Sequence, residues 1–303
     1  MINNIPTNDD FYKAGRELLD LAWDMIVKLL LNLKEGEYYG VDSDEISEEY
    51  WSKAKRQLTT SLSITQQGIE FLIKGRICQI SPFLLIIESP SKWPSPYRES
   101  VIDFNEFRTL DAQDLVRVHD TFSEVPFDKS FVKKFNELRE NRNIIMHSIS
   151  GGLELKFTEI IENLLFMHHS LFPDECWAKI RKDSLENSPN IELGSGDYLI
   201  NEVCREVALI IDILAPAKVK EYFKIDKKMR PYFCPSCYSD ANHDVGDFDY
   251  QLARFISKTT DCEHVYCPVC DKTYQISRTN CEDEECPGNV FSEEFGMCLT
   301  CAG

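Results

Sequence analysis

Cysteines gather in the last part of this sequence, in pairs whose spacing suits a metal ion. Nine of the twelve cysteines lie between residues 234 and 301. A Cys-x2-Cys turn supplies half of a tetrahedral four-thiolate site, and a second turn completes it. The sequence therefore predicts two metal sites, most simply zinc sites, with eight thiolate ligands in four pairs: Cys234 and Cys237, Cys267 and Cys270, Cys281 and Cys286, Cys298 and Cys301.

The simplest grouping joins the first pair with the second and the third with the fourth, as two successive zinc ribbons with short strands. The 29 residues between Cys237 and Cys267 exceed the usual spacing, so an insertion or a cross-braced grouping stays open. Cys262, His243 and His264 are spare candidate ligands. Four thiolates fill each tetrahedron, so both zincs are expected to be structural, contributing on the order of 10 kcal/mol each to folding.

A disulfide framework and an iron-sulfur cluster are the weaker alternatives for these cysteines. Disulfide frameworks belong to secreted domains, and residues 1–10 do not resemble a secretory signal. The three cysteines outside the cluster are expected to be ordinary thiols: Cys78, Cys176 and Cys204. We therefore expect a reducing, cytoplasmic location.

A second group of chemically capable residues lies at the end of a predicted amphipathic helix. Continuing its apolar stripe by helical steps leads to Arg142, and a guanidinium there needs a partner or a cleft. Asn143 and His147 are four residues apart and share a helical face. In one alternative Arg142 is simply the ion-pair partner of Glu137 or Glu140, and His147 is a satisfied residue near the helix end.

The segment Arg142-Asn143-x3-His147, in an all-helical region, resembles the Arg-x4-6-His signature of HEPN domains. The resemblance covers roughly residues 9–172 and includes the stretch from Asp111 to His119. It implies a bundle that forms a homodimer, with two motifs facing one cleft, and a metal-independent endoribonuclease in the active members of the family. It also implies a toxin or antiviral-defence effector, with RNA as substrate and a regulatory protein as a further expected partner.

The implied chemistry is physically reasonable. RNA carries its own nucleophile in the 2′-hydroxyl, and histidine is the side chain suited to general acid or base work near neutral pH. In that scheme His147 moves the proton, Arg142 binds the phosphate with its planar fork, and Asn143 orients His147 or the phosphate. Five helical residues place Arg142 and His147 about 140° apart, so a second chain or an unwound helix end is needed to bring them together.

The elements that would position these residues are helices. Apolar residues at helical spacing predict helices over residues 9–33, 45–80, 111–122, 128–148 and 155–171, and another that carries residues 200–214 and is closed by Pro216. Gly68 leaves open whether residues 45–80 form one helix or two. The serine- and proline-rich residues 89–96 predict a surface loop, and His168 falls on an apolar stripe, as core histidines do.

We expect a mainly α protein in three parts. Residues 1–175 form the HEPN-like bundle, residues 176–230 a helical extension with a basic connector, and residues 231–303 the double zinc-binding region. No apolar run is long enough to span a membrane. The net charge of −18 argues against non-specific binding of nucleic acid.

Two non-enzymatic functions compete with the ribonuclease. One is an interaction module in which the bundle dimerises and the ribbons bind a protein or nucleic acid. The other is a transcription-related zinc-ribbon adaptor. The adaptor would need basic and aromatic residues around the cysteine turns, whereas the residues between Cys281 and Cys286 are all acidic.

Overall fold

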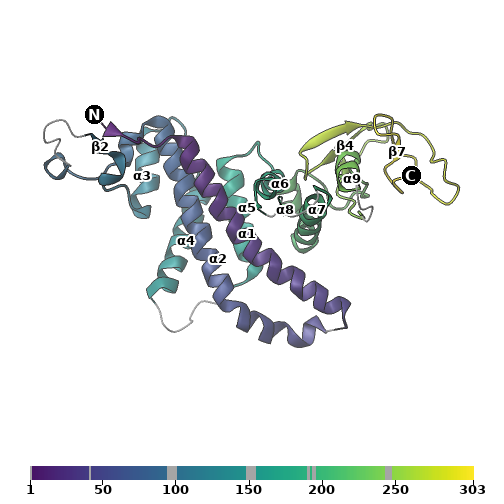
Figure 1. Cartoon of the computed structure of the whole chain (residues 1–303), viewed down its shortest axis with the longest axis horizontal. Helices are drawn as coiled ribbons and strands as arrows, with labels where there is room; N and C mark the ends of the chain where they lie inside the picture. The colour runs from purple at the N-terminus through teal and green to yellow at the C-terminus, as the bar shows by residue number, and fades with distance from the viewer. Residues whose placement is uncertain are drawn as a thin grey trace. The chain divides into compact units, whose positions relative to one another are not determined.

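The computed structural model is mainly α-helical, with a few short strands (Figure 1). It describes residues 2–40, 42–93, 101–147, 155–189, 192, 196–242 and 248–303. The chain divides into two compact units, Met1–Leu171 and Phe172–Gly303. Among the described helices, none is both long and apolar enough to cross a lipid bilayer. The expected mainly α fold with a strand-containing, cysteine-rich C-terminal region is confirmed.

The first unit is a bundle of five α-helices in its described residues. They are α1 (Asn8–Tyr38), α2 (Ser43–Ile80), α3 (Ala112–Phe122), α4 (Lys129–His147) and α5 (Phe157–Leu171). Short 3-10 helices cover Pro82–Leu85, Pro90–Lys92 and Phe104–Glu106, and a small parallel pair joins β1 (Ile2–Asn3) to β2 (Ile102–Asp103). Each predicted helix of this region is present, with ends shifted by a few residues.

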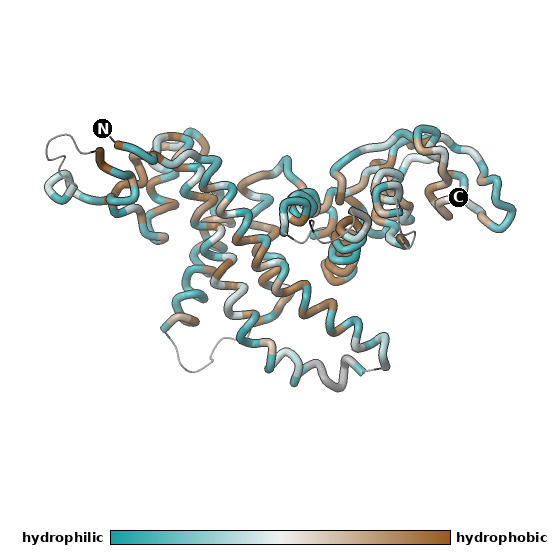
Figure 2. The backbone as a smooth tube through the Cα atoms, in the orientation of Figure 1, coloured by the Kyte–Doolittle hydropathy of each residue, from teal (hydrophilic) through white to brown (hydrophobic). Residues whose placement is uncertain are grey.

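The long helices α1 and α2 pack side by side and are the central elements of this unit (Figure 1). Hydrophobic and hydrophilic residues alternate along both (Figure 2), because one face of each is buried. The hydroxyl of Ser61, fully buried on α2, donates to the backbone carbonyl of Ala22 on α1 at 2.7 Å. Helix α2 is one continuous helix, so the break considered at Gly68 does not occur.

Gly68 instead serves the contact between the two helices. A Cβ on Gly68 would lie 3.0 Å from the carbonyl oxygen of Gly15, and one on Gly15 would lie 2.9 Å from that of Gly68. Neither backbone can move away without separating α1 from α2. The two glycines therefore set how closely these helices approach.

The second unit begins with helices and ends with strands. The helices are α6 (Trp177–Glu186), α7 (Gly196–Ile213), α8 (Pro216–Phe223) and α9 (Pro235–Ala241). The strands β3 (Arg254–Phe255), β4 (His264–Cys267) and β5 (Lys272–Gln275) form one antiparallel sheet, and β6 (Phe291–Ser292) and β7 (Met297–Cys298) form a second. Residues 176–230, set apart in the sequence as an extension, lie in one unit with the cysteine-rich residues.

The apolar periodicity of the sequence did not place α6, α8 or α9. Pro216 does not merely follow α7: it occupies the first turn of α8, where its missing N–H costs nothing. Basic residues of the expected connector are largely used inside the unit. Lys227 donates to the carbonyls of Ile211, Asp212 and Leu214 at 2.8–3.1 Å and so caps the end of α7.

A buried ion pair holds α6 against α7. The guanidinium of Arg181 donates two hydrogen bonds to the carboxylate of Glu206, at 2.9 and 2.8 Å, and both side chains are almost fully buried. Such a bidentate pair fixes geometry strongly. Losing one partner strands the other charge in the interior.

Gly15→Ala is expected to destabilise the first unit by about 1–3 kcal/mol, because overpacking against α2 outweighs the better helix propensity of alanine. Denaturant unfolding measures the change. Lys13→Ala, exposed on the same helix, is the control and should change stability little. Equal stability of Gly15→Ala and the wild type would contradict the packing argument.

Arg181→Met is expected to destabilise the second unit by about 3–5 kcal/mol, because Glu206 is left charged and buried. Adding Glu206→Leu should recover a large part of this loss, since it removes the stranded carboxylate. Thermal unfolding of the single and double variants tests the pair. A double variant less stable than Arg181→Met would show that the pair is not the source of the effect.

Candidate metal centres and a polar cleft

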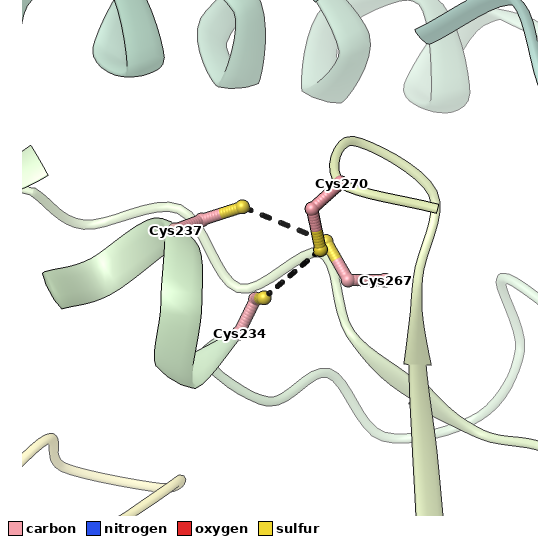
Figure 3. A group of neighbouring side chains, drawn as sticks. All are labelled: Cys234, Cys237, Cys267 and Cys270. Atoms are coloured by element: carbon pink, nitrogen blue, oxygen red, sulfur yellow. Dashed lines mark hydrogen bonds between the residues drawn. The ribbon is translucent and has the colours of Figure 1, made fainter. Parts of the chain in front are cut away.

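Four cysteines converge in the interior of the second unit (Figure 3). Cys234 precedes α9 and Cys237 lies within it, whereas Cys267 ends β4 and Cys270 lies in the turn before β5. The Sγ atoms of Cys234 and Cys270 are 3.6 Å apart, and those of Cys237 and Cys267 are 3.9 Å apart. Sulfur atoms around a tetrahedral zinc, at about 2.3 Å from the ion, are separated by about 3.8 Å. We call this group the inner cysteine site.

The outer cysteine site groups the remaining four predicted ligands. The Sγ atoms of Cys281 and Cys301 are 3.6 Å apart, and those of Cys286 and Cys298 are 4.0 Å apart. In each site all four sulfurs lie within 4.8 Å of one another. The structure thus has the sequential grouping and not the cross-braced one, and the long segment between Cys237 and Cys267 is an insertion that carries β3. Two metal ions fit these two sets of donors.

The spare candidates lie outside both sites. The Cys262 thiol faces the backbone carbonyl of His264 at 3.4 Å, and neither residue belongs to a four-cysteine group. His243 lies outside the described residues. Of the other cysteines, burial raises the pKa of Cys176 to about 11 and also raises that of Cys78, as expected of unreactive thiols.

Burial governs the chemistry of the inner site. It raises the pKa of Cys234 and Cys267 well above the usual range of a thiol, because a thiolate in the interior lacks solvent. The other three cysteines lower the pKa of Cys270 by hydrogen bonding, and the Tyr274 hydroxyl, 3.2 Å away, adds to this. Four thiolates can coexist here only with a cation between them.

The inner site is also supported by residues that the cysteine pattern did not predict. Lys182 lies beside it: burial opposes its charge, but the Glu186 carboxylate and the Cys237 thiolate raise its pKa overall. Arg254 is buried near Cys267. Burial lowers the pKa of its guanidinium, and the negative charge of Cys267 partly offsets this decrease. A divalent ion with four thiolates carries a net charge of −2, and these cations balance part of it.

Cys204 is a further neighbour of the inner site. It is buried on α7, and a hydrogen bond with its thiol is the largest cause that raises the pKa of Cys237. Its sequence position within an apolar stripe gave no sign of this contact. Only the packing of α7 against α9 brings the two thiols together.

The outer site is open to solvent. Cys301 is exposed, Cys281 and Cys286 are half-buried, and the four acidic residues 282–285 are all exposed. Burial raises the pKa of Cys298, but the backbone N–H groups of Thr300 and Cys301 bring it down to about 7. Solvent and a chelator therefore reach this site more readily than the inner one.

A polar cleft lies on the first unit, where α4 meets α2 and the start of α3. It encloses about 450 Å³, and its lining includes Lys74, Arg139, Arg142 and Asn143. Helix α4 is anchored here because Phe131, Phe135 and Leu138 are buried, as the predicted stripe requires. Arg142 follows on the same stripe, at the edge of the core.

Arg142 makes few contacts with its surroundings. Its Nη1 donates to Asn143 Oδ1 at 3.4 Å, and it forms no ion pair within the described residues. Glu137 contacts Lys134 and Lys133 instead, at 3.2 and 3.8 Å. Arg142 also borders a second cleft of about 480 Å³, whose lining includes Phe71 and Met146.

His147 is the last residue of α4 and is exposed. It is not among the described residues that line either cleft, whereas Arg142 lines both. The side chain of Asn143 contacts Arg142 and not His147. The expected end of this helix, residue 148, lies outside the described residues. His168 is almost fully buried on α5, as its stripe position indicates.

Comparison with known proteins gives no relative: no family model, curated protein or solved structure matches the chain. The resemblance to HEPN domains therefore stays a prediction that depends on the motif.

The outer site is expected to lose its metal first when the protein is treated with a chelator, because its ligands are exposed and the inner ones are buried. Metal released over time, measured with a colorimetric indicator, should show a fast and a slow phase of one ion each. Cys301→Ser should remove the fast phase and Cys270→Ser the slow one. Release of both ions in a single phase would contradict the difference in access.

Proposed function

We propose that this chain is a metal-independent endoribonuclease of HEPN type. The observation that carries the proposal is Arg142: a guanidinium with no ion-pair partner among the described residues, at the edge of a polar cleft. Asn143 lies beside it, and an exposed histidine ends the same helix. This arrangement supports binding of a phosphodiester by Arg142 and proton transfer by His147.

The reaction is a transesterification. The 2′-oxygen of a ribose attacks the adjacent phosphorus while His147 takes its proton, and the bond from phosphorus to the 5′-oxygen breaks. The 5′-oxygen takes up a proton from a second acid, and the products are a 2′,3′-cyclic phosphate and a 5′-hydroxyl. Arg142 stabilises the charge that builds on the phosphoryl oxygens. No metal takes part in these steps.

The second acid comes from a second copy of the chain. Arg142 and His147 point about 140° apart on one helix, so a homodimer through the first unit brings the His147 side chains of both copies to one substrate. Ile144 and Met146, on the same turns, are 45% and 58% exposed, and burying them would favour association.

The two metal ions are zinc and are structural. Thiolate-only tetrahedra suit zinc, and no coordination position is left for a substrate. Free thiols in such number are kept in the reducing cytoplasm. An enzyme that cleaves cellular RNA fits a toxin or an antiviral-defence effector, and the acidic surface fits an inhibited state that a regulatory protein partner controls.

The second candidate is a non-catalytic interaction module. It is favoured by the distance around the helix between Arg142 and His147, and by the exposed acidic loop of the outer site, residues 282–285. In this case the bundle dimerises and the zinc-binding region binds a protein or nucleic acid. It predicts that substituting His147 leaves every nucleic-acid readout unchanged.

Wild-type protein is expected to cleave single-stranded RNA in magnesium-free buffer, and His147→Ala and Arg142→Ala should each lower the rate at least about 100-fold. Gel analysis of end groups should show cyclic phosphates. Arg142→Lys should retain part of the activity, since it keeps the charge but not the planar fork.

Lys133→Ala is the matched control, because Lys133 is exposed on the same helix and contacts Glu137. Each variant is checked for two bound metals and for the dimer. The enzyme proposal would be wrong if the wild type leaves RNA intact, or if His147→Ala cleaves RNA as fast as the wild type. The interaction module would then remain.

A further inference from the structure

The polar cleft beside Arg142 carries more positive charge than one catalytic arginine requires. Lys74 reaches it from α2, and Arg139 lies one turn before Arg142 on α4. Three cations thus border one cleft, in a chain whose net charge is −18. Elsewhere on the chain, by contrast, cations such as Lys28, Lys53 and Lys258 lie within 2.8 Å of a carboxylate.

These three cations have no acid partner within the described part of the chain. The ammonium of Lys74 lies 5.9 Å from the centre of the Phe71 ring, and the guanidinium of Arg142 donates a hydrogen bond to Asn143. The Nε atom of Arg139 is buried without a hydrogen-bond partner. A buried donor in that state costs free energy, and no carboxylate of the described residues neutralises this guanidinium.

The two acids that line the cleft are already engaged. Glu70 accepts a hydrogen bond from the amide of Gln66, and Asp111 forms an ion pair with Arg108 at 2.9 Å. Three cations therefore face two carboxylates, one of which is neutralised by another arginine. The net field in the cleft favours an anion.

The first turn of α3 adds to this field. Ala112 and Gln113 line the cleft, and the side chain of Asp111 makes no capping hydrogen bond to the helix. The first N–H groups of a helix lack internal partners and favour negative charge. They support the cations and do not define the site alone.

We infer that Lys74, Arg139 and Arg142 form a phosphate subsite that binds the backbone of an RNA strand. The inference rests on the proposed ribonuclease function and extends it by naming two positioning residues, Lys74 and Arg139. In this subsite the guanidinium of Arg139 binds a phosphodiester oxygen, while Lys74 contacts a neighbouring oxygen as a point charge. The strand then passes Arg142, which borders both clefts.

The test measures binding apart from cleavage. Full-length protein is titrated with a fluorescent 2′-O-methyl RNA oligonucleotide, which lacks the nucleophile, at several salt concentrations. Lys74→Gln and Arg139→Gln should each weaken binding on the order of tenfold and lower the slope of log affinity against log salt by about 0.7. Lys133→Gln, on the outer face of α4, should change neither quantity.

The outcomes separate this inference from the enzyme. If the wild type cleaves RNA but both variants bind like it, the subsite is wrong and the ribonuclease stands. If the wild type binds with the expected slope and loses it in the variants, yet cleaves nothing, the subsite stands and the enzyme is wrong. No binding by the wild type overturns the subsite. The variants lie on different helices, so misfolding of one still leaves a decisive measurement.

Discussion

Four sulfur atoms held within 4.8 Å of one another in a protein interior impose the strongest constraint on this structure. As thiolates they repel one another and lack solvent, and as thiols they would form no fixed arrangement. A cation at their centre resolves both problems and ties α9 to the turn between β4 and β5. The parts around it follow from the same requirement. Lys182 and Arg254 contribute positive charge, and Tyr274 donates to Cys270.

Helices α6 and α7, which precede the cysteines in the chain, pack around the inner cysteine site. They therefore belong to the same unit as that site. Helix α7 packs against α9, and α6 is held to α7 by the Arg181–Glu206 pair. Lys182 follows Arg181 in the sequence, and the negative charge of Cys237 and Cys270 helps to raise its pKa. A region that looked like a connector is therefore a support for the inner site, and its basic residues are used largely within the unit.

The first unit is organised by close packing and not by metal. Gly15 and Gly68 let α1 and α2 approach, and α2 in turn supports α4. The buried stripe of α4 ends at Arg142, where the helix leaves the core. Charges at that edge are partly shielded from water yet open to a ligand, and for this reason we propose that the cation cluster there binds phosphate. Lys74 and Arg139 belong to this cation cluster only because α2 and α4 place them at the same cleft.

The sequence by itself determined the helices with strong apolar periodicity, the eight cysteines that form the two four-cysteine groups, and the stripe that leads to Arg142. These depend on local spacing, and local spacing is fixed by residue order. It did not place α6, α8 or α9, whose short segments lack a clear period. Only the tertiary structure decided between the sequential and the cross-braced grouping of the cysteines, and which helix supports the inner site. It alone showed that Cys204 touches Cys237 and that Lys74 and Arg139 join Arg142. Those contacts join residues that are far apart in the chain, or depend on how helices pack against one another. The spacing of residues in the sequence does not predict such contacts.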